Sequence, residues 1–281
     1  IGKTPGVRIT SNGGMPGAGS RIRIRGGSSL NASNDPLVVI DGLPANGLGM
    51  LNPSDIESFT ILKDASATAI YGSRAANGVI LVTTKKGKAG GPLKVDLHVV
   101  NSTREVTKSL DVLSPSQFVD MINDRGTNTQ INRLATASGY EKVNGSIVMS
   151  DSARSTDWQD EIYRTGSVQD INVAITGGIA NLPYRLSMGY YHENGVLNRS
   201  DLKRYSLAIN ASPSFMDGRL TANVSGKVIK DDNFYANQGA IGTAIFFDPT
   251  RPVHSGDTSF GGYFEWLMPN GTPSTLSPKN P

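Results

Sequence analysis

Few side chains in this sequence are spaced for catalysis or metal binding. His192-Glu193 lacks the second histidine of an HExxH zinc motif, because Val196 stands in its place. The glycines from Gly13 to Gly19 form neither a GxGxxG pattern nor a phosphate loop followed by lysine, and no GxSxG nucleophile motif occurs. The sequence contains no cysteine. We therefore expect no enzymatic activity, no cofactor and no metal site.

Three arginines have a spacing that suggests a different role. Arg21, Arg23 and Arg25 alternate with isoleucines, so they share one face of a strand and require acidic partners. The net charge is only +3, far from the clustered basicity of nucleic-acid-binding proteins, so we expect no nucleic-acid partner. Asp231-Asp232 is expected at a solvated strand end, with calcium binding as the alternative.

Aromatic residues in loops are the candidate ligand contacts. Trp158, Tyr263, Phe264 and Trp266 would stack on sugar rings or contact a partner lid if exposed, and would pack the loop if buried. Both interpretations stay open. Asn46, at the start of a glycine-rich loop, is a further candidate for a ligand or lid contact.

The stretch from Asp55 to Gly87 predicts a strand, a short helix, a turn and a second strand. Ser58 to Leu62 alternate in polarity, Ala65 to Tyr71 are good helix formers, and Val79 to Thr84 are β-branched and nearly all apolar. A strand as apolar as the last needs cover on both faces. Before this stretch we expect a strand at Leu37–Ile40 and a single helical turn at Pro53.

Beyond residue 90 the pattern changes to five amphipathic strands. Each is about 9 to 11 residues long, the length that a tilted membrane-spanning strand needs. The last four are joined by short turns and should form an antiparallel meander. We expect long loops at about 105–166 and 231–281, the first with one helix that begins at Pro115 after a Ser114 and Gln117 capping box. The strands are centred on Val95–Val99, Ile171–Ile175, Tyr184–Tyr190, Tyr205–Ile209 and Leu220–Val228.

Alternation alone does not decide whether the apolar faces meet lipid or a second sheet. Tyrosines near strand ends (Tyr184, Tyr190, Tyr205) and the alternation of short turns with long loops favour lipid. Five strands leave two open edges, and membrane barrels close with at least about 8, so we expect the beginning of a larger barrel. The alternative is a soluble β-rich carbohydrate-binding or adhesion module.

Five segments carry a resemblance to a known family. SDIESFTILKDASATAIYGSRAANGVILVTTKKG closely resembles the plug-domain motif of SusC-like TonB-dependent outer-membrane transporters of Bacteroidetes-type bacteria, and RIRIRGGSSLNASNDPLVVIDGLP resembles their upstream plug motif. TDWQDEIYRTGSVQDINVAITGG resembles the approach to the second barrel strand. GAIGTAIFFDPTRPV and GGYFEWL resemble an early extracellular loop, so the resemblance covers nearly the whole chain.

The resemblance implies a transmembrane β-barrel of about 22 strands with an N-terminal α+β plug domain. Residues 1–90 would be the plug without its first part, and residues 91–281 the start of the barrel, integral to the outer membrane and surrounded by its lipid. Such proteins import nutrients, most often oligosaccharides and sometimes peptides. A SusD-like surface lipoprotein caps the barrel, and TonB supplies the energy.

The resemblance also assigns residues to the contact between plug and barrel. Arg25 and Lys63 occupy plug positions that in related transporters pair with barrel-wall glutamates, and Arg23 and Arg74 are further candidates. Such an ion pair at a water-lined interface is stable when paired and weak enough to release under force.

Overall fold

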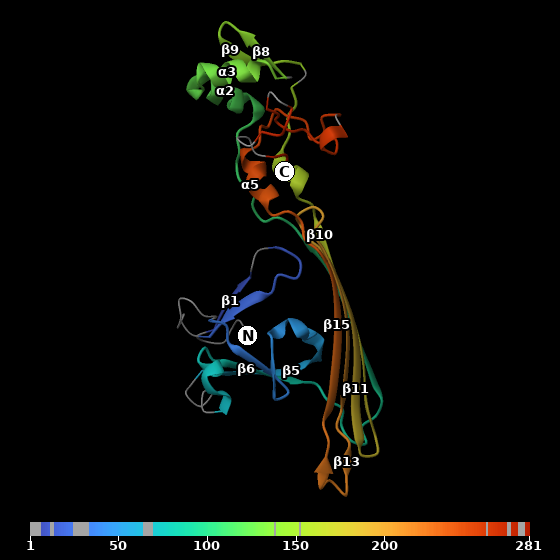
Figure 1. Ribbon diagram of the computed structural model, residues 1–281. Coiled ribbons are helices and arrows are strands. Elements are labelled where there is room, and N and C mark those ends of the chain that lie inside the picture. Colours follow the sequence, from blue (N-terminus) through green and yellow to red (C-terminus); the bar gives the residue numbers. More distant parts are fainter. Residues whose placement is uncertain are drawn as a thin grey trace. The chain divides into compact units, whose positions relative to one another are not determined.

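The computed structural model describes residues 7–11, 14–24, 34–63, 70–137, 139–151, 153–256, 258–268, 271–274 and 279–281. The chain divides into two compact units (Figure 1). The plug and wall unit comprises residues 1–104, 166–195 and 199–235, and the loop unit comprises 105–165, 196–198 and 236–281. No helix within the described ranges is long and apolar enough to cross a membrane.

The plug is the part of the first unit that precedes residue 90, and it contains two small sheets. The first pairs β1 and β2 antiparallel. The second has four strands in the order β4-β3-β6-β5, in which β3 runs parallel to β6. The strands are β1 (Arg8–Ser11), β2 (Ser20–Arg23), β3 (Leu37–Ile40), β4 (Leu43–Ala45), β5 (Ile56–Leu62) and β6 (Val79–Thr84).

The apolar strand β6 is covered on both faces, as its sequence predicts. Val79 and Ile80 are 0% exposed, and they belong to two different core clusters. Successive side chains of a strand point to opposite faces, so each cluster occupies one side of the sheet. Most of the predicted helix at Ala65–Tyr71 lies outside the described residues.

Short turns connect the plug strands. Asp41 and Gly42 both have positive φ, 48° and 89°, as a two-residue hairpin turn between β3 and β4 requires. The 3-10 turns are η1 (Leu48–Met50), η2 (Pro53–Asp55) and η3 (Gly72–Ala75). The helical turn predicted at Pro53 is therefore confirmed.

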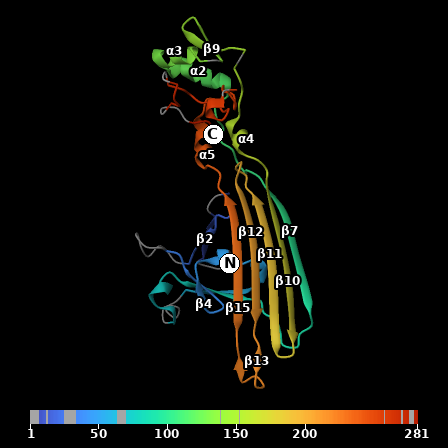
Figure 2. The same cartoon turned by 45° about the vertical axis from the view of Figure 1, so that its right-hand side comes forward.

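The five long strands form one antiparallel sheet, called here the wall, in the order β15-β12-β11-β10-β7 (Figure 2). The predicted meander is confirmed. The predicted strand at Leu220–Val228 is wrong in its bounds. Leu220 and Thr221 belong to β14, which pairs with β13 in a terminal hairpin, and the spanning strand β15 runs from Val224 to Phe234. It extends to Phe234 because β12 supplies hydrogen-bonding partners as far as that residue. The strands are β7 (Lys94–Arg104), β10 (Gly166–Ile179), β11 (Leu182–Asn194), β12 (Asp201–Ala211), β13 (Ser214–Phe215), β14 (Leu220–Thr221) and β15 (Val224–Phe234).

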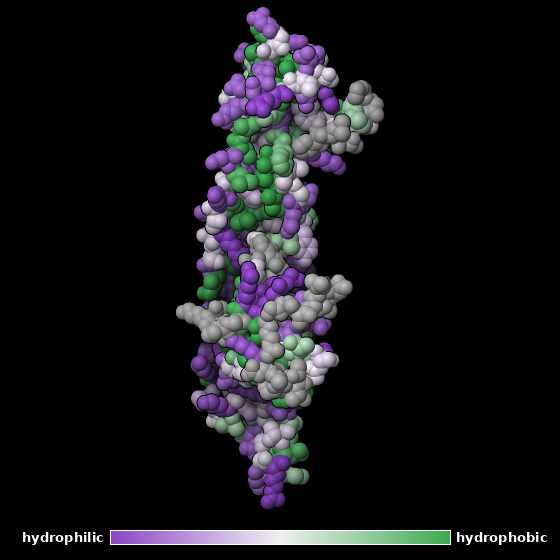
Figure 3. Space-filling view, turned by 90° about the vertical axis from the view of Figure 1, so that its left-hand side faces the viewer, coloured by the Kyte–Doolittle hydropathy of each residue, from purple (hydrophilic) through white to green (hydrophobic). Residues whose placement is uncertain are grey.

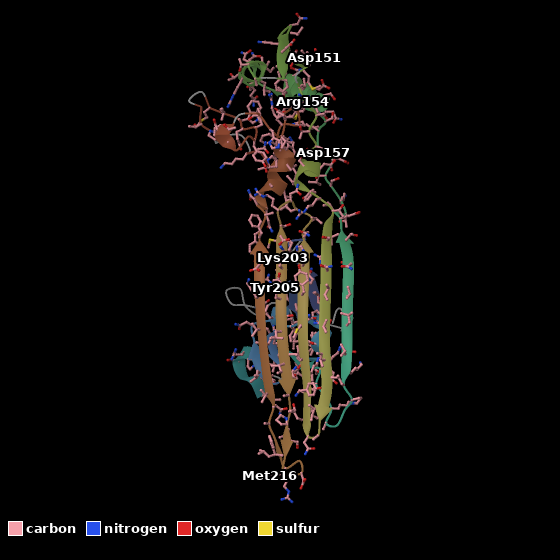
Figure 4. All side chains as sticks on the ribbon, turned by 90° about the vertical axis from the view of Figure 1, so that its right-hand side faces the viewer. Asp151, Arg154, Asp157, Lys203, Tyr205 and Met216 are labelled. Carbon is pink, nitrogen blue, oxygen red and sulfur yellow. The ribbon has the colours of Figure 1, made fainter. Side chains whose placement is uncertain are left out.

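The strand register gathers apolar side chains on one face of the wall. Leu97, Val173, Met188, Leu207 and Val228 lie directly across from one another along the five strands. Figure 4 views this face, with Tyr205 labelled on β12 and the plug behind the sheet. Met188 is 52% exposed and Leu207 43% exposed.

The opposite face of the wall is polar, and its central part is buried. Arg185 and Ser187 of β11 are 5% and 4% exposed and contact the plug. In the described residues no second sheet covers the apolar face. This arrangement is inverted relative to a soluble sandwich, and it suits a wall with lipid outside and a polar lumen inside.

The loop unit contains more regular structure than its sequence predicts. The capping box of Ser114 and Gln117 at the start of α2 is confirmed. A single helix in this region is wrong, because a second box, Thr127 with Gln130, starts α3, and Asp157 caps α4. The elements are α2 (Pro115–Arg125), α3 (Asn128–Ala135), β8 (Tyr140–Val143), β9 (Ser146–Met149), α4 (Trp158–Ile162), α5 (Gly239–Phe246) and η4 (Thr258–Phe260).

Two apolar clusters hold the loop unit together. Val119, Ile131, Tyr140 and Ile147 join α2 and α3 to the β8–β9 hairpin. The second cluster contains residues of α4 and α5. Figure 3 shows hydrophobic side chains gathered on one face of this unit, and on α5 itself Phe246 is 75% exposed.

Candidate functional site at the contact of plug and wall

The segment Gly49–Asp55 of the plug lies against the polar face of the wall. We call this contact the docking seam. It has three points, at Gly49, Asn52 and Asp55, and each meets a different feature of the wall. The wall residues of the seam are Arg185, Ser187 and Gly189 on β11 and Arg204 on β12.

The strongest point is the carboxylate of Asp55. Its Oδ1 accepts from Arg185 Nη2 at 3.0 Å, and its Oδ2 accepts from Ser187 Oγ at 2.7 Å. Arg185 Nη1 donates to Thr176 Oγ1 at 2.9 Å, which fixes the guanidinium against β10. The Arg185 and Asp55 side chains are only 6% and 7% exposed, so this ion pair is largely removed from water.

The local sequence places Asp55 firmly within the plug. Asn52 caps η2 by accepting from Ser54 N at 2.9 Å, and Pro53 at the first position suits the turn. The Asp55 carbonyl accepts from Lys85 N at 2.9 Å, so the turn is tied to the end of β6. These bonds tie the turn that carries the carboxylate to the four-stranded sheet.

At the second point, Asn52 lies against a wall residue that has no side chain. A Cβ added at Gly189 would come within 2.6 Å of Asn52 Nδ2 and 2.5 Å of Ser206 Oγ. Glycine here allows plug and wall to approach closely.

The third point is the carbonyl of Gly49, which accepts from Arg204 Nη1 at 3.2 Å. Arg204 also holds both carboxylate oxygens of Asp231, from Nε and Nη2, at 2.7 Å each. The bidentate pair fixes the arginine so that its remaining donor points at the plug. Asp231 is exposed, as expected for a solvated position, but it lies within β15 and is paired with Arg204.

A cavity of about 1270 Å³ adjoins the docking seam. Arg74 and Asn46 of the plug both line it, together with Tyr191, Asp170 and Arg204 of the wall. Hydrogen-bonding groups of both charge signs and one aromatic ring therefore face the same space, a lining able to hold a polar ligand. The structure therefore brings Asn46, predicted for ligand contact, and Arg74, predicted for the contact of plug and barrel, to the same cavity.

The other predicted plug cations have different positions. Arg23 is half-buried on β2, Lys63 is half-buried directly after β5, and Arg25 lies outside the described residues. Their pairing with barrel-wall glutamates stays a prediction. The ion pair that the seam contains has the opposite polarity, a plug carboxylate with a wall guanidinium. This pair was not predicted; its signal in the sequence is Arg185, an arginine on the polar face of a spanning strand, which requires an acidic partner.

The aromatic candidates in the loop unit differ in exposure. Trp158 is 3% exposed, and its Nε1 donates to Asp248 O at 3.0 Å, so it is a core residue and presents no open ring face. Phe264 and Trp266 are half-buried and lie beside the Arg251 guanidinium, at 5.5 and 4.6 Å. Tyr263 is 44% exposed, with its ring centre 4.8 Å from that of His254.

Arg251 organises a buried polar cluster that sequence analysis did not find. It lies 4.5 Å from the Tyr140 ring centre and pairs with Asp248 at 3.0 Å. The Tyr140 hydroxyl donates to the Asp248 carboxylate and accepts from Thr250 Oγ1 at 2.7 Å. Burial, followed by the Asp248 charge, raises the pKa of Tyr140 to about 12. The loop unit therefore has a defined interior of its own.

Residues 1–79 match the family model of the TonB-dependent Receptor Plug Domain. The chain is 46% identical over 290 aligned residues to TonB-dependent receptor SusC of Bacteroides thetaiotaomicron. This alignment covers 99% of this chain and 27% of SusC. It is 43% identical over 210 residues to TonB-dependent receptor P3 of Formosa agariphila, covering 74% of this chain and 19% of P3. The chain thus spans about a quarter of the length of SusC.

Solved structures share the fold. The RagAB peptide importer in its open-open state matches with a TM-score of 0.74 at 23% identity, covering 99% of this chain and 33% of that chain. The RagAB peptide transporter matches with a TM-score of 0.66 at 25% identity, and the match covers 82% of this chain and 28% of that chain. The plug model, the identity to SusC and the shared fold show that this chain belongs to the SusC-like TonB-dependent receptors, integral β-barrel proteins of the outer membrane, and that it comprises plug and partial barrel wall.

Proposed function

We propose that the receptor containing this segment imports an oligosaccharide across the outer membrane, powered by TonB, with the plug gating the barrel lumen. The inverted wall carries the proposal: its polar face is buried on the plug while its apolar face is open. The 46% identity to SusC supports the same class of transport. In this proposal a SusD-like surface lipoprotein caps the barrel, and the protein performs no catalysis.

The chemistry of the docking seam suits a plug that must move. Two of its three points are polar, the hydrogen bond at Gly49 and the hydrogen-bonded ion pair at Asp55, and water can replace such partners when the interface opens. An apolar interface of equal area would expose unsolvated surface at every opening. The polar seam therefore closes the lumen without permanently joining plug and wall.

A peptide is the second candidate substrate. The likeness to the RagAB peptide transporter favours it, and the hydrogen-bonding groups that line the cavity would serve a peptide backbone as well as sugar hydroxyls. The two substrates require different growth tests.

Deletion of the gene in its own host, followed by growth on single purified oligosaccharides or on defined peptides, tests the proposal. We expect loss of growth on one oligosaccharide class, restored by the wild-type gene and abolished again when TonB is removed. Selective loss on peptides would favour the second candidate. Recovery of the intact protein as a soluble periplasmic monomer, without heat-modifiable migration, would contradict both.

A further inference from the structure

We propose that Asp55, Arg185 and Ser187 form a latch that keeps the lumen closed between transport events. The inference rests on the proposed import function and names the point at which closure of the same site is controlled. Asp55 acts here as a positioning residue of the plug, since its carboxylate determines where η2 sits on β11.

The latch is built from two wall side chains that converge on one carboxylate. Arg185 and Ser187 are two residues apart on β11, so both point to the plug face and each takes one oxygen of Asp55. Thr176 holds the guanidinium from β10. The wall side is therefore preorganised by two neighbouring strands, and the plug side by η2 and β6.

Because the latch is buried, the loss of one of its two charges costs much more free energy than the intact pair contributes. With both charges present, each carboxylate oxygen and both terminal nitrogens of Arg185 have partners. Removal of the Asp55 charge leaves the Arg185 guanidinium buried without its hydrogen-bonded counter-ion, which is strongly unfavourable. Lys227 on β15 lines the same pocket as Asp55 and adds a second cation, while the carboxylates of Asp96 and Asp41, which also act on these cations, make no hydrogen bond to Arg185. The wall then favours states in which water reaches Arg185, and those are open states.

The other two points of the seam cannot replace this function. Gly49 contributes a neutral carbonyl, and Asn52 contributes close packing against Gly189. Within the described seam, the latch is the contact between opposite charges. Its loss should therefore be reversible by exchanging the two charges, whereas a purely steric role would not be restored in this way.

The test uses the full-length receptor in the outer membrane of a strain without TonB, with entry of vancomycin as the probe. This glycopeptide is too large for an intact outer membrane, so its entry reports an open lumen. We expect Asp55→Asn to raise entry at least about tenfold over wild type, since breaking a buried pair is costly. The exchange Asp55→Arg with Arg185→Asp should restore much of the barrier. Glu57→Gln, which removes an exposed carboxylate from the adjacent strand β5, is the matched control and should behave as wild type.

Abundance and heat-modifiable migration of each variant are measured in parallel. If Asp55→Asn does not reach the membrane, Ser187→Ala takes its place, because it removes one hydrogen bond to Asp55 and leaves both charges; a severalfold rise in entry is then expected. Wild-type entry in a normally assembled Asp55→Asn or Ser187→Ala receptor would overturn the latch, as would failure of the charge exchange to lower entry. Because the assay needs neither TonB nor substrate, a tight wild-type receptor that imports nothing would refute the import proposal alone.

Discussion

At the scale of single residues, the seam depends on a glycine as much as on its charges. Gly189→Ala would place a methyl group 2.5 Å from Ser206 Oγ and 2.6 Å from Asn52 Nδ2. Because Asn52 also caps η2 by accepting from Ser54 N, its side chain cannot turn away from the methyl group without loss of that cap. We expect the plug to be held less tightly, by about 1–3 kcal/mol. Faster hydrogen exchange at Asp55 and Lys85 in the purified receptor would show it. Gly226→Ala in β15, where the added group meets only Ile209 at 3.3 Å, should leave exchange unchanged.

The phenol of Tyr140 gives the loop unit a defined pH dependence. Its pKa is about 12 in the folded state, above the ordinary value near 10, so the unfolded chain ionises first as the pH rises. Stability of the unit should be unaffected below pH 10 and fall between about pH 10 and 12. Cleavage by an alkaline-stable subtilisin, measured across this range, reports the loss.

Tyr140→Phe removes the titrating group and serves as the control for that measurement. It should abolish the alkaline part of the decline, while it lowers stability at neutral pH by about 1–3 kcal/mol, because Asp248 and Thr250 lose a buried partner. An unchanged alkaline decline in this variant would assign it to another group.

At the scale of elements, the helices of the loop unit depend on their N-terminal caps. Ser114 Oγ accepts from Gln117 N, and Gln117 Oε1 accepts from Ser114 N at 3.0 Å. Ser114→Ala should destabilise α2 by about 1 kcal/mol. Hydrogen exchange over Pro115–Arg125 measures the effect. Asp124→Ala, an exposed change near the other end of the helix, should not alter exchange in the first turn.

At the scale of the whole molecule, the inverted wall makes a prediction that separates a membrane wall from a soluble sheet. Leu207 is 43% exposed on the apolar face. In water, lysine at such a position would be harmless; in lipid, it should cost about 2–4 kcal/mol near the bilayer midplane. We therefore expect Leu207→Lys to reduce heat-modifiable, folded receptor in the membrane.

His98→Lys is the matched change on the opposite, polar face of the wall, on β7 and away from the latch, and it should be tolerated because that face meets the polar lumen. Equal assembly of the Leu207→Lys and His98→Lys receptors would contradict a lipid-facing wall.

Local patterns in the sequence determined many elements of this protein. The apolar run of β6 required cover on both faces, the period-two strands required a sheet with one apolar face, and Ser114 with Gln117 required a helix start. Each follows from interactions within a few residues, which a sequence displays directly. The Thr127 and Gln130 box is the same kind of local signal, so the start of α3, which was not predicted, is also encoded within a few residues.

Only the tertiary structure decided which face of the wall meets the plug and which residues meet across it. Asp55 and Arg185 are 130 positions apart, and their contact depends on the register of β11 against β10 and on the placement of η2. Burial separated Trp158, a core residue, from the exposed Tyr263 in the same way. The alternation of polar and apolar residues shows that a strand has two different faces. Only the packing of segments distant in the sequence determines what each face contacts.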